Sequence, residues 1–184
     1  MPTSSTATAT DTVPATAAVT GHAEGIASHG TLDVAPANAL GRWTLHCDGS
    51  AVPNPGRMGL GAVLVAPDGE RHTVSYLAPG TGCNNEAELR AVSAALDAAR
   101  AHGATAVRLH TDSTTVVAHL GPAAPSPIPH LAEAFAEART RLAAFADAEL
   151  RWIPGHRNGE ADALARAALG LPPRTVAAPR KRRR

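Results

Sequence analysis

The chain has 184 residues, a length that suits one domain with its own core and leaves little room for two. Its net charge is +1, and no apolar run approaches the roughly 20 residues that span a membrane. Aromatic residues make up only 3% of it, so a core of Ala, Val and Leu is expected. With two cysteines and no secretory signal, the sequence argues against a membrane or disulfide-rich protein and predicts a soluble cytoplasmic one.

Composition divides the chain into three regions. Residues 1–40 are rich in Ala, Thr, Ser, Pro and Gly and show no helix or strand period, which predicts a disordered tail. Residues 41–170 carry the periodic apolar patterns and are expected to form the single folded domain. Residues 171–184 are Pro-rich and then basic, which predicts a second flexible tail.

The folded region begins with segments that have the patterns of strands. Residues 42–48 alternate between apolar and polar side chains and predict a strand. The turn-rich residues 51–59 are expected to form a loop. Residues 59–66 and 71–77 flank a Pro-Asp-Gly turn and predict a hairpin.

Helices and strands then alternate. Residues 85–102 have an apolar stripe at helical spacing, with Asn84 or Asn85 able to cap the start and Gly103 ending the helix. The remaining expected elements are a strand at 106–112, a short helix at 113–120, a proline-broken segment at 121–129, a helix at 130–146, a strand at 148–153 and a helix at 158–169. This order, β-β-β-α-β-α-α-β-α, predicts an α/β fold with a mixed five-stranded sheet and helices on both faces.

Two aspartates end neighbouring predicted strands in matching settings. Asp48 lies in His-Cys-Asp-Gly-Ser and Asp112 in His-Thr-Asp-Ser-Thr. Ligands of α/β proteins gather outside strand ends, so two carboxylates there would repel one another unless a cation lies between them. The simpler alternative is that each aspartate only caps a loop or a helix.

Helical geometry separates the two acids of Cys-Asn-Asn-Glu-Ala-Glu-Leu. Glu86 falls on an expected solvent face, spaced for an ion pair with Arg90. Glu88 heads the apolar face, where a carboxylate needs a counter-charge or, alternatively, interacts only with its own helix N-terminus. Asp162 points inward at the start of the last helix, and a Gly-rich loop before it carries His156, a candidate proton shuttle or product-release residue.

Carboxylates from four segments would therefore meet at one end of the sheet. A ligand set made only of oxygen suits Mg²⁺ or Mn²⁺, whereas zinc would require clustered Cys and His. Paired hard cations are used to hydrolyse phosphodiesters. No P-loop is present, so nucleotide hydrolysis of that type is not supported.

In these motifs the chain resembles type 1 ribonuclease H. The matching segments, in order, are DGSAVPNPGRMGLGA at 48–62, NNEAEL at 84–89, TDS at 111–113 and GHRNGEADALA at 155–165. The resemblance covers about 41–170. It implies the ribonuclease H-like fold and cleavage of the RNA strand of RNA–DNA hybrids, with two Mg²⁺ ions or Mn²⁺, leaving 5′-phosphate and 3′-hydroxyl ends.

The resemblance also implies roles for single residues. It makes Asp48, Glu88, Asp112 and Asp162 the metal ligands and His156 the family's mobile histidine. It further implies a substrate-binding set, in which Gly49 and Asn84 lie near RNA 2′-hydroxyls. This set consists of Gly49, Ser50, Asn54, Cys83, Asn84, Asn85, Ser113 and Thr114.

The sequence departs from the family in three places. Cys83 stands where the family often has Thr, which weakens an expected DNA-phosphate contact. The segment 121–129 is short and uncharged where some members have a basic protrusion. Residues 42–170 contain eleven arginines against thirteen acids, so we expect the basic tail, Arg174 with Arg180–Arg184, to supply phosphate attraction. The alternative is that the tail only solubilises the chain.

Two other functions stay open on the sequence alone. One is a nucleic-acid-binding module on the same fold that has lost catalysis. The other is a metal nuclease of the same superfold that acts on DNA, such as an integrase or resolvase. The presence of all four acids disfavours the first, and the asparagines and their spacing to Glu88 disfavour the second. A monomer is expected.

Overall fold

The computed structural model describes residues 41–174, so the predicted tail at 1–40 and most of the tail at 171–184 lie outside the described residues. The described chain has the predicted order of strands and helices, with two short 3₁₀ turns added at Pro129–Leu131 and Gly155–Arg157. The elements are β1 Trp43–Val52, β2 Gly56–Val65, β3 Arg71–Gly82, α1 Asn84–Ala101, β4 Ala106–Thr111, α2 Thr114–Leu120, α3 Ala132–Ala143, β5 Asp147–Trp152 and α4 Gly159–Ala168.

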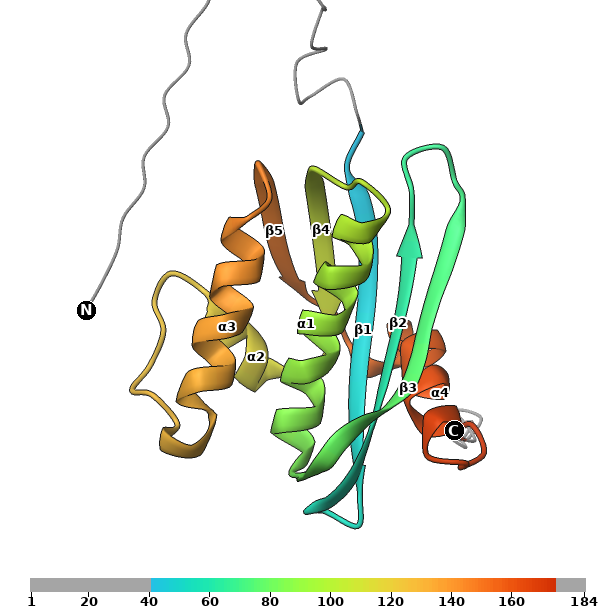
Figure 1. Cartoon of the computed structure of the whole chain (residues 1–184), viewed down its shortest axis with the longest axis vertical. Coiled ribbons are helices and arrows are strands. Elements are labelled where there is room, and N and C mark those ends of the chain that lie inside the picture. Colours follow the sequence, from blue (N-terminus) through green and yellow to red (C-terminus); the bar gives the residue numbers. More distant parts are fainter. Residues whose placement is uncertain (1–40, 175–184) are drawn as a thin grey trace, which may run out of the picture. The chain divides into compact units, whose positions relative to one another are not determined.

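The strands form one sheet in the order β3-β2-β1-β4-β5. The β1–β2 and β2–β3 pairs are antiparallel, while β1–β4 and β4–β5 are parallel. The predicted mixed five-stranded sheet is therefore confirmed. β1 and β4 run in the same direction side by side, and β4 ends at Thr111 while β1 continues to Val52 (Figure 1). The end of β4 therefore lies beside the middle of β1, where Asp48 is found.

Helices cover both faces of the sheet, as predicted. On one face α1 lies against β1 and beside α3 (Figure 1). The opposite face receives α4, which packs mainly on β2. Glycines allow this second contact, because a Cβ at Gly59 or Gly61 would lie 2.1 Å or 2.3 Å from carbonyl oxygens of α4. The core between α1 and the sheet contains fully buried side chains such as Leu45, Leu89 and Leu109.

Three expected boundaries are wrong. The strand predicted at 71–77 continues to Gly82 as β3, because its pairing with β2 extends to the pair Gly56–Gly82. The loop predicted at 51–59 is mostly strand, because the β1–β2 ladder continues to the pair Val52–Arg57 and leaves only 53–55 as the turn. The helix predicted at 130–146 is α3, which ends at Ala143. The chain leaves the helix there because the backbone N–H of Ala146 bonds the carbonyl of Thr105, which starts the β5 pairing.

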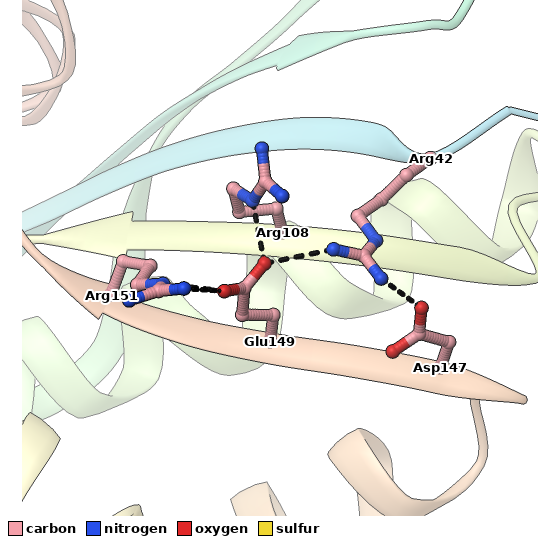
Figure 2. A network of polar contacts seen from close by, with 5 residues as sticks. All are labelled: Arg42, Arg108, Asp147, Glu149 and Arg151. Carbon is pink, nitrogen blue, oxygen red and sulfur yellow. Dashed lines mark hydrogen bonds and ion pairs between the residues drawn. The ribbon is translucent and has the colours of Figure 1, made fainter.

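Charged side chains form a network across β4, β5 and the residue before β1 (Figure 2). Glu149 accepts hydrogen bonds from Arg42 at 2.8 Å and from Arg108 at 2.6 Å, and it also pairs with Arg151. Asp147 pairs with Arg42. The hydrogen bond from Arg108 is the first cause of a lowered pKa of Glu149.

Within residues 41–174, none of the helices combines the length and the apolar character that crossing a membrane would require. Cys47 and Cys83 are both free thiols. Burial, followed by the nearby carboxylates, raises the pKa of the Cys47 thiol far above its ordinary value, which keeps it protonated.

Candidate active site

The four acids come from four different elements and lie at one end of the sheet. Asp48 is in β1, and Asp112 directly follows β4, its parallel neighbour. Glu88 is near the start of α1, and Asp162 is in the first turn of α4. Helices on opposite faces thus each bring one carboxylate toward the place where β4 ends beside Asp48 of β1.

The electrostatics of Asp48 show how closely these groups lie. Asp48 is only 8% exposed, and its pKa is raised to about 7, first by burial and then by the charges of Asp112, Asp162 and Glu88. A hydrogen bond from the backbone of Gly49 opposes the shift. The pKa of Glu88 is also raised by burial, and the Asp112 charge adds to the effect. The other three carboxylates therefore lie within electrostatic range of Asp48.

This arrangement fits hard divalent cations. The donors are all carboxylate oxygens, the chemistry preferred by Mg²⁺ and Mn²⁺. Among the described residues, no basic side chain counters the rise in the pKa of Asp48, although Asp162 pairs with Arg174. Across residues 41–174 no three His, Cys, Asp or Glu side chains are already drawn together as a metal cage. A bound cation would offset the mutual repulsion of these carboxylates.

Asp112 is held by the segment that joins β5 to α4. Its backbone carbonyl accepts a hydrogen bond from Trp152 Nε1 at 3.1 Å, and its carboxylate Oδ1 accepts one from Asn158 Nδ2 at 2.8 Å. Gly155 lies next to the other oxygen, since a Cβ there would be 2.9 Å from Asp112 Oδ2. The neighbouring His156 is exposed in the turn Gly155–Arg157, and its ring forms no hydrogen bond within the described chain.

Asn158 is the residue of this site that sequence reasoning missed. It is 2% exposed and directly precedes α4. Its position four residues before Asp162 could have drawn attention to it, because a backbone bond links residues at that spacing at a helix start. Its side-chain partners could not be identified without the fold.

The two glutamates of α1 lie in different environments. Glu86 pairs with Arg90 at 2.8 Å, as predicted. The expected solvent face is only partly right, since the Glu86 side chain is 20% exposed and lines a hollow of about 460 Å³ with Arg90, Asp97 and Arg141. Glu88 has no arginine partner within residues 41–174. Burial raises its pKa, and a hydrogen bond from the Ser113 side chain opposes this rise.

The start of α1 is capped from outside the helix, so the predicted cap by Asn84 or Asn85 is wrong. Cys83 occupies the N-cap position and makes no side-chain cap bond. Instead Asn54 Oδ1 accepts from the backbone N–H of Asn84 at 3.0 Å, and Asn84 Oδ1 accepts from the N–H of Ala51 at 2.8 Å. Because both oxygens are used in this way, the Nδ2 groups of both exposed asparagines are left to face outward.

The other predicted binding residues divide into buried and exposed ones. Ser113 is buried and its Oγ caps α2 by accepting from the N–H of Val116 at 3.2 Å. Ser50 is buried, and Gly49 is buried beneath α1. Thr114 and Asn85 are exposed, and their side chains form no hydrogen bond within residues 41–174.

Comparison with known proteins agrees with this geometry. Residues 46–168 match a family model described as reverse transcriptase-like. Ribonuclease HI of Halobacterium salinarum is 36% identical over 129 residues, which are 70% of this chain and 65% of that protein. The bifunctional protein Rv2228c of Mycobacterium tuberculosis is 34% identical over 137 residues, 73% of this chain and 37% of that protein.

Solved structures with the same fold give the same result. The RNase H1 structure from Halobacterium salinarum has a TM-score of 0.67 at 36% identity and covers 71% of this chain and 98% of that one. LC11-RNase H1 in complex with an RNA/DNA hybrid has a TM-score of 0.64 at 27% identity and covers 70% of this chain and 97% of that one. The chain spans less than two thirds of the length of its curated relatives. The match over most of the described chain nevertheless shows that it belongs to the ribonuclease HI family.

Proposed function

We propose that this protein is a ribonuclease H that hydrolyses the RNA strand of RNA–DNA hybrids. The observation that carries the proposal is the convergence of Asp48, Glu88, Asp112 and Asp162 from four elements, with the pKa of Asp48 raised to about 7 by burial and by the other three carboxylates. Relatives named as RNase H1, one of them in complex with an RNA/DNA hybrid, support it.

In this proposal the four carboxylates hold two Mg²⁺ ions, or Mn²⁺. When bound, such ions activate an attacking water and stabilise the leaving oxygen of a phosphodiester. The water oxygen bonds to phosphorus and the bond from phosphorus to the 3′ oxygen breaks, which gives 5′-phosphate and 3′-hydroxyl ends. His156, exposed on the turn beside Asp112, would accept or deliver a proton or assist product release.

The asparagines of the β1–β2 turn and of α1 supply the recognition of the hybrid in this proposal. The Nδ2 donors of Asn54 and Asn84 face outward at fixed positions, because their oxygens are held by backbone N–H groups. Such donors can bond the 2′-hydroxyl or base edges that distinguish RNA from DNA. Asn85, Thr114 and Cys83 complete the predicted contact surface.

The basic C-terminal residues are proposed to attract substrate phosphates. Arg174 is the last described residue, and its guanidinium lies 3.0 Å from Asp162. The chain therefore returns from α4 to the edge where the acids lie, and five more basic residues follow in the sequence at Arg180–Arg184. A monomeric cytoplasmic enzyme remains part of the proposal.

The test is cleavage of a labelled RNA–DNA hybrid beside duplex DNA and duplex RNA, with Mg²⁺ or Mn²⁺. We expect the parent to cut only the RNA strand of the hybrid, and Asp112→Asn to lose this activity. Asp97→Asn is the matched control, because Asp97 is an exposed acid of α1 paired with Arg141.

Each alternative function gives a different result in the same assay. Binding of hybrid without cleavage by the parent would indicate a binding module, and cutting of duplex DNA would indicate a DNA nuclease. Equal cleavage by the parent and by Asp112→Asn would refute the four-carboxylate site.

A further inference from the structure

Asn158 forms hydrogen bonds to three separate parts of the active site. Its Nδ2 donates to Asp112 Oδ1 at 2.8 Å and to the backbone carbonyl of Cys47 at 2.9 Å. Its own carbonyl accepts from the N–H of Asp162 at 3.0 Å. Asn158 is therefore bonded to the carboxylate of Asp112 and to the backbone of Asp162. It is also bonded to the peptide that directly precedes Asp48.

We propose that Asn158 is a positioning residue that sets the orientation of Asp112 and the spacing of three of the four carboxylates for cation binding. This inference rests on the proposed function and adds a residue to it. Asn158 is buried at 2% exposure behind the acids and is not expected to contact the substrate.

The bond to Asp112 selects which of its oxygens faces the site. Asn158 occupies Oδ1, whereas Oδ2 lies beside Gly155, where the absence of a side chain leaves room. A Cβ at Gly155 would be 2.9 Å from Oδ2. The amide and the glycine together leave Oδ2 of Asp112 as the oxygen available to a cation.

The amide of Asn158 satisfies both acceptors with one nitrogen. The carbonyl of Cys47 and the carboxylate of Asp112 both need an N–H, which fixes the orientation of the amide with Nδ2 toward them. The other amide atom, Oδ1, is buried and has no hydrogen-bond partner among the described residues.

The main test is Asn158→Ala, compared with Val107→Ala as the control for lost stability. Val107 is fully buried in β4, away from the acids, so its truncation lowers stability without touching the site. For Asn158→Ala we expect the Mn²⁺ dissociation constant, measured by calorimetry without substrate, to rise about 10-fold or more. We expect kcat on hybrid to fall by a similar factor and KM for hybrid to stay within about 2-fold. Val107→Ala should change only the melting temperature.

A second variant, Asn158→Asp, keeps the shape and removes the N–H donors, so it remains informative if Asn158→Ala does not fold. We expect it to lose at least about 10-fold in kcat. Parent-like kcat in Asn158→Asp, or parent-like Mn²⁺ affinity in Asn158→Ala, would overturn the proposal. Because the Mn²⁺ titration needs no cleavage, it tests Asn158 even if the parent fails to cut hybrid, a result that would instead refute the proposed function.

Discussion

Gly49 of β1 lies directly against the backbone of Ala87 in α1. A Cβ at Gly49 would be 2.1 Å from the carbonyl carbon and oxygen of Ala87 and 2.3 Å from the N–H nitrogen of Glu88. The helix therefore sits on the strand without an intervening side chain. This close contact brings Glu88 within electrostatic range of Asp48 in the neighbouring position of β1.

Gly49→Ala is expected to displace α1 and to separate these two acids. Overpacking of this kind costs about 1–3 kcal/mol of unfolding free energy. We also expect hybrid cleavage to fall at least about 10-fold, as for the loss of a group that orients metal ligands. The control is Gly159→Ala, because a Cβ at Gly159 meets nothing within 4 Å. Thermal unfolding and cleavage assays check both; a parent-like Gly49→Ala would show that the contact can relax.

Glu86 and Glu88 form a matched pair on one helix. Glu88→Gln removes a candidate cation ligand, so we expect kcat on hybrid to fall about 100-fold or more. Glu86→Gln removes only the ion pair with Arg90, a contact worth a few tenths of a kcal/mol, and should leave kcat within about 3-fold. Equal effects in steady-state cleavage would contradict the assignment.

Asp48 is expected to make the metal-free protein less stable as the pH rises. Its folded pKa of about 7 lies above the ordinary value of 3.8. Its stabilising contribution is therefore complete below about pH 4 and is lost as the pH rises through 7. Each unit of pKa difference corresponds to about 1.4 kcal/mol, so Asp48→Asn should stabilise the protein at pH 8 by at least about 1 kcal/mol.

Melting temperatures in a chelating buffer at pH 5 and pH 8 test this expectation. The parent should lose more stability than Asp48→Asn between the two values. Added Mn²⁺ should raise the melting temperature of the parent at pH 8 and should leave that of Asp48→Asn unchanged. Identical pH dependence of the two proteins would show that the Asp48 environment is more polar than its burial indicates.

Cys83 is the N-cap residue of α1 and makes no side-chain cap bond. Its backbone already has the extended N-cap conformation, so a hydroxyl there can accept from the N–H of Asn85 or Glu86. We expect Cys83→Thr to raise the unfolding free energy by about 0.5–1 kcal/mol and to lower KM for hybrid. Cys83→Ala is the control and should do neither. Chemical denaturation measures the unfolding free energy and steady-state kinetics measures KM. If Cys83→Thr matches Cys83→Ala in both, the expected cap and phosphate contact are refuted.

Removal of residues 174–184 is expected to weaken hybrid binding. The six basic residues of this segment attract phosphates in a salt-dependent way. KM should therefore rise and its dependence on salt should flatten, while kcat changes little. The single change Arg174→Gln separates the ion pair with Asp162 from the charge of the remaining tail. An unchanged KM and salt slope in the truncated protein would assign the tail a solubilising role.

The sequence was sufficient for features that depend on local spacing. The position of Asp112 follows from a strand end, and the different settings of Glu86 and Glu88 follow from helical periodicity. The strand end predicted at Asp48 is wrong, because β1 continues to Val52. The hydrogen bonds of Asn158 and Asn54 could not be predicted from the sequence, because their partners lie far away in the chain. Asn158 bonds residues 46 and 111 positions away, and Asn54 caps a helix 30 positions away. Proline at 53 and 55 suggested a long loop, although both lie within a three-residue turn.

The charged network of Figure 2 has a consequence for the solution behaviour of the protein. β5 is an edge strand, and such edges offer free backbone groups to a strand of another molecule. Asp147, Glu149 and Arg151 occupy alternate positions along it. Asp147 pairs with Arg42, Glu149 pairs with Arg108, and Arg151 pairs with Glu149 of the same strand. A second chain that added to β5 would bring its own side chains against these charges. These charges therefore disfavour the edge-to-edge pairing of strands that leads to aggregation.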